Sequence, residues 1–495
     1  MKQEQIDSLR RAVIAPQSHI IGGKTTPSVS GRTLTVISPI DGKAFTSIAE
    51  GSAEEVNLAV AAARAAFDKG VWRNAAPAER KKRLLKLAEL IEANALEIAV
   101  LGSRDNGTEI SMALKAEPLS AATTFRYYAE AIDKIYGEIA PTAPDVLALI
   151  HREPLGVVGI IVPWNFPLMI GAWKIAPALA AGNSVVVKPA EIASLSLLRI
   201  AGLALEAGIP EGVFNVVTGK GSVVGEALGL HMDVDALGFT GSGAIGRRLL
   251  EYSARSNIKR VFLELGGKSP NIVFADAPNL DQAAKATAFG IFRNAGQVCI
   301  AGSRLLIEES VHDEFLEKVV ACTRKLKSGD PLDVTTEIGA VASADQLGKN
   351  LQFVANATRE GGKLLLGGAR IREETGGFYQ SPAIFADVVP TMEIAREEVF
   401  GPVLAVMRFK DEAGAVQLAN NTVYGLASGV WTANLARAHR MVRAIRAGVV
   451  HVNCYGGADI TVPLGGFGQS GFGRDKSLHA MEKFSDLKTA WMSLS

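Results

Sequence analysis

Cys299 is the residue of this chain whose surroundings best suit nucleophilic chemistry. It stands in the run Phe292-Arg-Asn-Ala-Gly-Gln-Val-Cys-Ile-Ala-Gly302, between two glycines that can keep its approach open. A thiolate is a strong nucleophile, and its ionisation needs a partly open site with nearby dipoles or charges. The alternative is a small apolar residue packed in a core, as most free cysteines are. The run therefore predicts a candidate active site around this thiol.

A carboxylate and an amide offer the partners that such a thiol requires. Glu264, in the run Leu263-Glu-Leu-Gly-Gly-Lys-Ser-Pro270, can act as a general base, and the two glycines leave its loop free to swing. Asn165 lies in Pro163-Trp-Asn-Phe-Pro167, where two prolines hold it, so its amide can donate to a developing oxyanion. A turn-forming asparagine is the alternative interpretation.

Two glycine-rich turns are typical of a dinucleotide site. Thr240-Gly-Ser-Gly-Ala-Ile-Gly246 follows a strand-like run and precedes a helical stretch, so its backbone amides can hold a pyrophosphate. Thr218-Gly-Lys-Gly-Ser-Val-Val-Gly225 has the same setting, and one dinucleotide can contact both turns. Each run is also compatible with a structural glycine loop at a helix start.

Lys188 and Glu191 flank a proline where another strand-like run ends. A carboxylate at a strand end accepts hydrogen bonds from ribose hydroxyls, and its charge repels the 2′-phosphate of NADP. Glu191 therefore favours NAD. The alternative is an ordinary solvated strand end, which is common for charged residues in loops.

Alternating strands and helices must position these groups. From about residue 156 to 273, short β-branched runs alternate with helical patterns, which predicts a parallel sheet covered on both faces. Such sheets bind ligands at the carboxyl ends of their strands. The expected strands are 157–162, 184–187, 213–216, 236–239 and 260–263, and the expected helices are 168–181, 195–206 and 244–255.

Further elements are expected on both sides of this region. A second alternating region predicts another α/β domain, with strands at 304–307, 403–409 and 449–452 and helices at 311–327, 344–359 and 435–447. Two helices are expected near the N-terminus, at 53–67 and 77–100. Strand-like segments at 146–152 and 488–492 predict a projecting ribbon that pairs between subunits, or alternatively a plain surface hairpin.

The bulk properties of the chain exclude several classes of function. Its 495 residues are enough for roughly two or three domains. A net charge of +1 gives no excess of positive charge that would indicate binding to nucleic acid or to an anionic membrane. No apolar run reaches the roughly 20 residues that span a bilayer. Cys299, Cys322 and Cys454 form neither a disulfide framework nor a metal cluster, and neither His151 nor His451 lies at a metal-binding spacing. A small-molecule ligand and a reducing, cytoplasmic setting are expected, with Cys322 packed in its helix and Cys454 approaching the site without a catalytic role.

Six motifs, in this order and spacing, resemble the aldehyde dehydrogenase superfamily over nearly the whole chain. They are Pro163-Trp-Asn-Phe-Pro, Lys188-Pro-Ala-Glu, Phe239-Thr-Gly-Ser, Leu263-Glu-Leu-Gly-Gly-Lys, Gly296-Gln-Val-Cys and Glu398-Val-Phe-Gly-Pro402. Runs at 128–137, 298–304 and 473–480 are more narrowly similar to the γ-glutamyl-γ-aminobutyraldehyde dehydrogenase branch of putrescine catabolism.

The resemblance implies an α/β fold divided into three parts. A Rossmann-type parallel-sheet domain that binds NAD is expected at residues 1–135 and 155–265. An α/β catalytic domain is expected at 266–470. A small β-ribbon at 136–154 and 479–495 would mediate assembly into a homo-oligomer, either a dimer or a tetramer.

The activity that the resemblance implies is NAD-dependent oxidation of an aldehyde to a carboxylic acid. Cys299 would attack the carbonyl to form a thiohemiacetal, whose oxyanion the Asn165 amide and the Cys299 N–H would hold. After hydride transfer to the nicotinamide, Glu264 would activate the water that hydrolyses the thioester, and Lys174 would have a supporting polar role. The alternatives are a coenzyme A-acylating relative, a broad-specificity aldehyde dehydrogenase and a non-catalytic structural protein.

The same resemblance implies the NAD contacts. Lys188 and Glu191 would hold the adenosine ribose, Ser242 the pyrophosphate, and Glu398 with Phe400 the nicotinamide ribose and ring. Gly243 departs from relatives that often carry threonine there, which weakens the implied contact beside the pyrophosphate. The full set of implied cofactor residues is Ile161, Pro163, Trp164, Lys188, Glu191, Gly221, Gly225, Phe239, Gly241, Ser242, Leu265, Glu398 and Phe400.

The loop Gly456-Gly-Ala-Asp459 bears on the substrate, because many relatives carry an aromatic residue there. Gly457 and Ala458 would widen a substrate tunnel that Trp173 also lines. Asp459 would meet a cationic amine. An aminoaldehyde such as γ-glutamyl-γ-aminobutyraldehyde is therefore the expected substrate, and no metal is expected.

Overall fold

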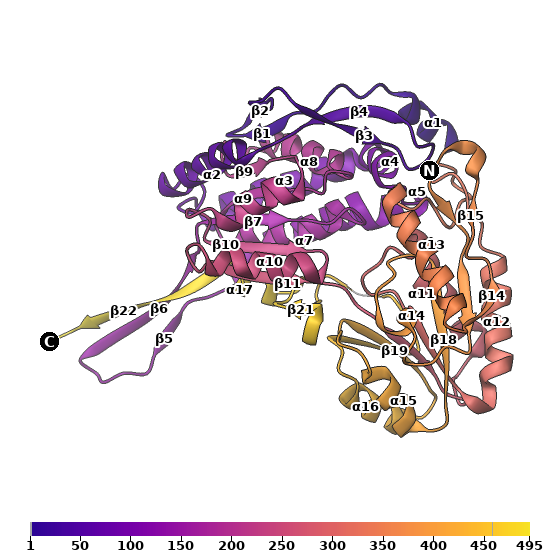
Figure 1. Cartoon of the computed structure of the whole chain (residues 1–495). Helices are drawn as coiled ribbons and strands as arrows, with labels where there is room; N and C mark the ends of the chain where they lie inside the picture. Colours follow the sequence, from indigo (N-terminus) through magenta and orange to yellow (C-terminus); the bar gives the residue numbers. More distant parts are fainter. Residues whose placement is uncertain (1, 458) are drawn as a thin grey trace.

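Two mostly parallel sheets organise the computed structural model, which describes residues 2–457 and 459–495 (Figure 1). The first sheet has the strand order β2-β1-β9-β8-β7-β10-β11-β21. The run from β9 to β11 is parallel, and the strands at both edges join it antiparallel. In sheet order the strands are β2 (Lys24–Thr26), β1 (His19–Ile21), β9 (Phe214–Val216), β8 (Ser184–Lys188), β7 (Val157–Ile161), β10 (Ala236–Thr240), β11 (Arg260–Glu264) and β21 (Gly471–Phe472).

Helices cover both faces of this sheet, because alternate residues of its strands enter two different apolar cores. Val158 and Ile160 of β7 pack in one core with α7 and α8, whereas Val157 and Ile161 pack in another core with α2. The covering helices are α2 (Ala53–Asp68), α7 (Pro167–Ala180), α8 (Leu195–Glu206), α9 (Glu226–Leu230) and α10 (Gly243–Ala254). The strands and helices predicted between 156 and 264 are confirmed, each to within one residue at either end.

The second sheet has the strand order β14-β17-β18-β13-β12-β19-β20 and is parallel except at β14. Its strands are β14 (Lys363–Leu366), β17 (Ala383–Ala386), β18 (Val403–Phe409), β13 (Arg304–Glu308), β12 (Pro270–Val273), β19 (Ala427–Trp431) and β20 (Val449–Val452). Its helices are α11 (Leu280–Phe292), α12 (His312–Arg324), α13 (Ala344–Arg359), α15 (Glu412–Asn420) and α16 (Leu435–Ala444). This confirms a second α/β region, in which β12, β14, β17 and β19 had not been predicted.

The single helix predicted at 77–100 is wrong, because the chain breaks there into two helices. α3 (Pro77–Ala93) and α4 (Ala95–Asn106) meet at Asn94, whose ψ of 14° departs from helical geometry. The Asn94 side-chain amide donates to the Leu90 carbonyl at 2.8 Å, a local bond that competes with the helical backbone pattern. The remaining elements are α1 (Gln3–Arg11), β3 (Thr33–Ile37), β4 (Ala44–Ala49), α5 (Ile110–Leu114), α6 (Ser120–Ala131), β15 (Arg370–Ile371), β16 (Tyr379–Gln380), α14 (Glu393–Arg396) and α17 (His479–Glu482).

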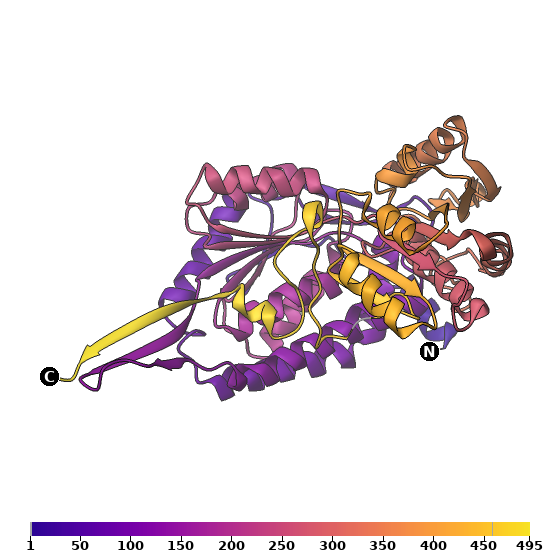
Figure 2. The same cartoon turned by 90° about the horizontal axis from the view of Figure 1, so that it is seen from below.

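A ribbon extends away from both sheets (Figures 1 and 2). It consists of β5 (Glu138–Ala140), β6 (Val146–Pro154) and β22 (Ser485–Ser493), in the order β22-β6-β5. The antiparallel register of β22 and β6 runs from Ser485 opposite Pro154 to Ser493 opposite Val146. Trp491 of β22 is 67% exposed, so the ribbon presents a large apolar side chain to its surroundings.

The described residues, 2–457 and 459–495, include no helix that is both long and apolar enough to cross a membrane. Within the same ranges, no three His, Cys, Asp or Glu side chains are grouped as metal ligands. Cys299, Cys322 and Cys454 are free thiols. Cys322 packs against the core of the second sheet, as predicted.

Candidate active site

A cavity of about 370 Å³ opens where β7, β10 and β11 of the first sheet end. Residues that follow these strands line it, together with α13 and the segment that precedes β18. The predicted residues on its wall are Pro163, Trp164, Asn165, Gly241, Ser242, Leu265, Cys299, Glu398 and Phe400. One cavity therefore joins the predicted nucleophile to the predicted cofactor contacts, at the strand ends where the sequence placed a ligand.

The turn that presents Cys299 has an unusual backbone. After α11 ends, Asn294, Ala295 and Gly296 all have positive φ values, of 50°, 51° and 74°. A side chain at Gly296 would collide with the carbonyl of Gly401. Because two of these residues carry side chains in the left-handed region, neighbouring contacts must hold the turn in place.

Buried hydrogen bonds hold the turn at residues 294–296 in place. Asn294 accepts from the Thr108 hydroxyl at 2.9 Å, and its backbone N–H donates to Glu109 Oε1 at 3.0 Å. Gln297 Oε1 accepts from the Ala342 N–H at 2.8 Å. The motif had identified Gln297 only as a neighbour of Cys299, and Thr108 and Glu109 carried no sequence signal because they lie far away in the chain.

Two donors are placed for an oxyanion near the thiol. Asn165 is 3% exposed, and its Nδ2 donates to the Gln297 carbonyl at 2.9 Å. One of its two N–H groups remains for a ligand, and so does the backbone N–H of Cys299, which donates to no acceptor among the described residues. The bond to Gln297 orients the Asn165 amide relative to the cysteine turn, which is what preorganised stabilisation of an oxyanion requires.

The electrostatics around Cys299 oppose its ionisation. Burial raises the pKa of the Cys299 thiol to about 12, and the charges of Glu398 and Glu264 act in the same direction. The N–H of Ile300 and the guanidinium of Arg293 partly offset them. The sequence had suggested nearby dipoles and charges that favour the thiolate. The structure instead holds a neutral thiol, which must lose its proton when ligands enter the site.

Glu264 ends strand β11 and is 7% exposed. Burial and the charge of Asp475 raise its pKa well above that of an ordinary glutamate, and the charges of Lys174 and Lys483 only partly oppose this. Its Oε1 has no hydrogen-bond partner among the described residues. A side chain at Gly465 would lie 2.8 Å from that oxygen, so the glycine makes room for the carboxyl group.

A buried charge cluster lies beside Glu264. Lys174, on α7, forms an ion pair with Asp475, which also pairs with Lys483. All three side chains are at most 7% exposed. Lys174 thus acts on Glu264 through its charge, and the sequence had not indicated Asp475 or Lys483 as parts of the site.

Gly266 and Gly267 serve close packing in this structure. A side chain at Gly266 would collide with the carboxylate of Glu398, and one at Gly267 would lie 2.8 Å from the Cys299 carbonyl. The Gly267 N–H donates to Glu398 Oε1 at 2.9 Å. These glycines bring the base, the nucleophile and the implied nicotinamide contact close together, a role that the sequence interpretation of a free loop did not include.

The other implied cofactor residues lie along the neighbouring strand ends. Lys188 Nζ pairs with Glu191 Oε2 at 2.9 Å, and a side chain at Gly221 would lie 3.7 Å from that nitrogen. Burial raises the pKa of Glu191, but the ion pair outweighs it and the net shift is downward, so the carboxylate is charged. A side chain at Gly225 would lie 3.8 Å from Ile161. The run 218–225 follows β9 and opens a helix, as predicted, and Gly221–Gly225 forms a π-helical turn that continues into α9.

The cavity wall fits a dinucleotide. Ser242 is the N-cap of α10 and lines the cavity, so the free amides of the first helical turn lie beside it and suit a pyrophosphate. The hydroxyl of Thr240 lines the same wall, is buried and has no partner among the described residues. Phe239 packs against Gly241, where a side chain would collide with its ring.

The sequence interpretation missed the residues of α13 on the cavity wall. Gln346 donates to the Val399 and Phe400 carbonyls at 3.1 and 3.3 Å, and the Phe400 ring meets Trp164 edge to face at 5.3 Å. Lys349 and Phe353 lie further along the same helix, α13. Their helical spacing of three and four residues is visible in the sequence, but nothing there shows which face of α13 meets the site.

Two neighbouring cavities, which share Trp173 and Lys476, lie next to Cys299. The inner cavity, of about 180 Å³, is lined by Cys299, Phe166, Met169 and Trp173 among others. The outer cavity, of about 370 Å³, shares Trp173 with it and contains Asp459. We call the two together the substrate tunnel. Ala458, an expected wall residue, lies outside the described residues, and Cys454 is exposed and lines neither cavity.

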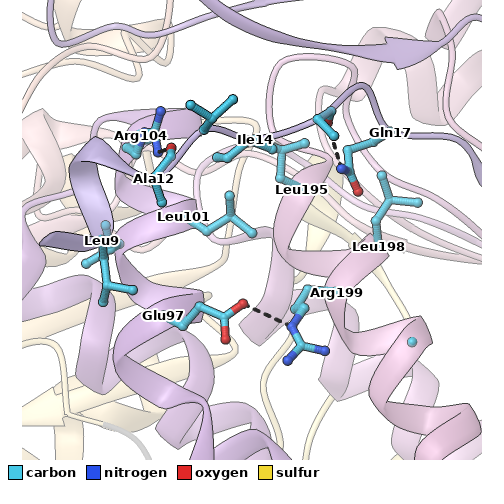
Figure 3. A pocket seen from close by; sticks show the side chains of 14 residues that line it. Leu9, Ala12, Ile14, Gln17, Glu97, Leu101, Arg104, Leu195, Leu198 and Arg199 are labelled. Atoms are coloured by element: carbon cyan, nitrogen blue, oxygen red, sulfur yellow. Dashed lines mark hydrogen bonds and ion pairs between the residues drawn. The ribbon is translucent and has the colours of Figure 1, made fainter.

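A separate cavity of about 410 Å³ lies under the N-terminal segment (Figure 3). Leu9, Leu101 and Leu195 give it an apolar wall, and the ion pair of Arg199 with Glu97, at 3.1 Å, borders it. None of the predicted catalytic or cofactor residues lines this cavity.

Comparison with known proteins agrees with this geometry. Residues 26–490 match the model of the aldehyde dehydrogenase family. The chain belongs to this family. The match confirms the resemblance and, with the solved structures below, the predicted fold class.

Individual aldehyde dehydrogenases resemble the chain over almost its full length. The NADP/NAD-dependent aldehyde dehydrogenase PuuC of Escherichia coli is 51% identical over 96% of this chain and 95% of its own. The γ-glutamyl-γ-aminobutyraldehyde dehydrogenase of Burkholderia cenocepacia superposes with a TM-score of 0.98 at 48% identity, covering 100% of both chains. A crystal structure of an indole-3-acetaldehyde dehydrogenase with NAD⁺ gives a TM-score of 0.98 at 49% identity and the same coverage.

The raised pKa of Cys299 makes a prediction for this aldehyde dehydrogenase without cofactor. Alkylation of Cys299 by iodoacetamide should accelerate about tenfold per pH unit through pH 9.5, because only the thiolate reacts. Peptide mass spectrometry would follow Cys299 separately from Cys322 and Cys454. N-acetylcysteine is the control, and its rate should level off near pH 9. A plateau of the Cys299 rate below pH 9 would contradict the electrostatic argument.

Proposed function

We propose that the chain oxidises aldehydes to free carboxylic acids with NAD as the hydride acceptor, with Cys299 as nucleophile and Glu264 as base. The observation that supports this most directly is that Cys299 and the Asn165 amide line one cavity, whose wall includes Leu265 and Gly266 directly after Glu264, and that the charge of Glu264 acts on the Cys299 thiol. No structural role accounts for a nucleophile, an unpartnered carboxyl oxygen and a free amide donor in the same place.

In the first step, the Cys299 sulfur bonds to the aldehyde carbon while its proton leaves the thiol. The carbonyl oxygen becomes an oxyanion that the Asn165 Nδ2–H and the Cys299 N–H stabilise. NAD, when bound, supplies the site that accepts the hydride. Glu264 is the nearby base for the thiol proton, because its charge already acts on Cys299.

In the second step, Glu264, which has passed the thiol proton to solvent, takes a proton from water, and the resulting hydroxide attacks the thioester carbon and releases Cys299 as a thiolate. A carboxyl group with a raised pKa is suited to this task, because it holds the proton more firmly than an ordinary glutamate does. Lys174 and Lys483 keep the charge on Asp475 balanced during the proton transfer.

For the cofactor, the N-terminus of α10 with Ser242 would hold the pyrophosphate, and Glu398 with Phe400 would hold the nicotinamide end. Lys188 and Glu191 would bind the adenosine ribose, and the charged Glu191 carboxylate favours NAD over NADP. Gln346 and Lys349, which lie on the wall beside Phe400, are further candidates.

The proposed division of the chain follows its sheets. Residues 1–135 and 155–265 would form the cofactor domain and 266–470 the catalytic domain. The ribbon at 136–154 and 479–495 would pair between subunits of a dimer or tetramer. The exposed Trp491 and the free strand edges of β22 and β5 support that role.

For the substrate, we propose an aminoaldehyde. Asp459 lies in the outer cavity, and the N–H of Thr461, with the charge of Lys476, keeps its pKa below the usual value, so it is charged at neutral pH. One of the relatives compared above has a name that specifies γ-glutamyl-γ-aminobutyraldehyde, which supports the same class.

The catalytic assignment predicts different failures for two variants. Glu264→Gln should still form NADH in a burst of up to one equivalent per site, while its steady-state rate falls at least 100-fold, because hydrolysis has lost its base. Cys299→Ala should show neither burst nor turnover, and Cys322→Ser is the matched control that keeps both.

The turnover rate of the wild type should rise with pH as Glu264 loses its proton, and this rise should be absent in Glu264→Gln. Equal consumption of coenzyme A and formation of NADH would instead show an acylating enzyme.

The Glu191 carboxylate predicts cofactor preference. Wild-type kcat/KM should be at least tenfold higher with NAD than with NADP, and Glu191→Gln should narrow that ratio by about tenfold by removing the repulsion. Glu317→Gln, a change of one exposed charge on α12 of the second sheet, is the control. Equal kcat/KM values of the wild type with both cofactors would contradict the assignment.

The Asp459 carboxylate predicts substrate preference. Asp459→Ala should lower the ratio of kcat/KM for 4-aminobutanal to that for propanal by about threefold, as expected for one exposed ion pair. Asp459→Glu should retain the ratio. An unchanged ratio in Asp459→Ala would remove Asp459 from substrate recognition.

A further inference from the structure

Arg293 is a buried cation in the wall of the substrate tunnel. It follows α11 directly, is 9% exposed, and lines the inner cavity together with Cys299. Among the described residues, no carboxylate lies within 4.0 Å of its guanidinium, and its side chain donates no hydrogen bond. Its nearest specific partner is the face of Phe289, 5.1 Å away. A desolvated guanidinium with unused donors is costly, so its retention calls for an anionic partner.

The loop opposite Arg293 is shaped around it. A side chain at Gly456 would collide with the Arg293 guanidinium. Gly456 therefore makes room for a charged group. Burial lowers the pKa of Arg293, but an arginine remains protonated in proteins, so the wall carries a positive charge.

The acidic groups near Arg293 are already engaged. Glu109 influences its charge, but burial raises the pKa of Glu109 to about 7 and its Oε1 accepts from the Asn294 N–H at 3.0 Å. Tyr455 and Cys299 also influence the charge of Arg293, but burial raises the pKa of the Tyr455 phenol and of the Cys299 thiol, so both are neutral at rest. None of these three groups supplies a full negative charge in the tunnel.

Lys476 adds a second positive charge further out. It lines both the inner and the outer cavity, and its Nζ lies 5.7 Å from the centroid of the Trp173 ring. Burial lowers its pKa to about 8, so most of it is charged at pH 7. Within the described ranges, no carboxylate lies within 4.0 Å of this nitrogen either. Asp459 lines only the outer cavity, so the cationic groups occupy the deeper position.

We propose that Arg293 and Lys476 form a subsite that binds a carboxylate on the aldehyde substrate. The proposal rests on the function proposed above and narrows its substrate class to aldehydes whose chain carries a carboxylate. A guanidinium binds a carboxylate through two parallel N–H donors, which fixes orientation as well as charge. An acylated aminoaldehyde that ends in an amino-acid group fits where the two cavities adjoin, with its carboxylate at Lys476 and its ammonium at Asp459, whereas a shorter oxoacid places its carboxylate at Arg293.

Kinetics with aldehydes of matched length test the subsite. For the wild type, kcat/KM for 4-oxobutanoate and 5-oxopentanoate should exceed that for butanal and pentanal at least tenfold. Arg293→Met should lose at least tenfold on the two oxoacids and less than threefold on the two alkanals. Arg293→Lys should lose less activity on the two oxoacids than Arg293→Met, because lysine keeps the positive charge but lacks the two parallel N–H donors. Lys476→Met should show a smaller selective loss.

The unaffected oxidation of alkanals shows that the variants are folded. An equal loss on oxoacids and alkanals in Arg293→Met would overturn the proposal, because the guanidinium would then act on the thiol. A wild-type preference for alkanals would overturn it as well.

A second measurement needs no turnover and so separates this proposal from the proposed function. Glutarate should protect Cys299 of the wild type from iodoacetamide, with at least a threefold slower reaction, whereas 1,5-pentanediol should not. The protection should vanish in Arg293→Met. Protection by glutarate supports the subsite even in a protein that reduces no NAD, and its absence in the wild type would refute the subsite even in an active enzyme.

Discussion

The close approach of two backbones, at Gly296 and Gly401, is the constraint on which the site depends. It holds the left-handed turn before Cys299 against the segment that carries Glu398 and leads into β18. The same segment meets the end of β11 through the Gly267 N–H and Glu398. The nucleophile from the second sheet is therefore held close to the end of β11, where the base from the first sheet lies, because the backbones are in direct contact and leave no room for intervening side chains.

That closeness determines the electrostatics. Few positive charges lie near Cys299, Glu264 and Glu398, so burial raises the pKa of all three groups. The resting site consequently favours protonated groups, and the chemistry must create charge where the protein disfavours it. Donors already in position, such as the Asn165 amide, lower the cost of that charge without rearrangement. The cationic wall of the tunnel belongs to the same balance, because Arg293 also lowers the pKa of the thiol.

Strand and helix positions between 156 and 264 could be predicted because β7 and β8 are short β-branched runs buried on both faces and the neighbouring strands alternate with helices at a regular spacing. The family motifs located the nucleophile, the base and the cofactor contacts, since those residues are close in sequence to recognisable glycine turns. What the sequence could not indicate is how distant segments meet. Asp475, Lys483 and Arg293 carry isolated charges that look like surface residues until the fold buries them. Gly266 and Gly456 look flexible in a sequence, yet each one accommodates a specific charged side chain.

The last residues of the chain complete structures begun far earlier. β21 closes the edge of the first sheet beside Glu264, Asp475 and Lys483 surround that carboxyl group, and β22 pairs with β6. The ribosome synthesises these segments after the other strands of both sheets. Until then, the first sheet has an uncovered edge and the charge cluster beside Glu264 is incomplete. The nucleophile is made before the surroundings of its base exist. The order of synthesis thus makes the active centre one of the final parts of the molecule to take shape.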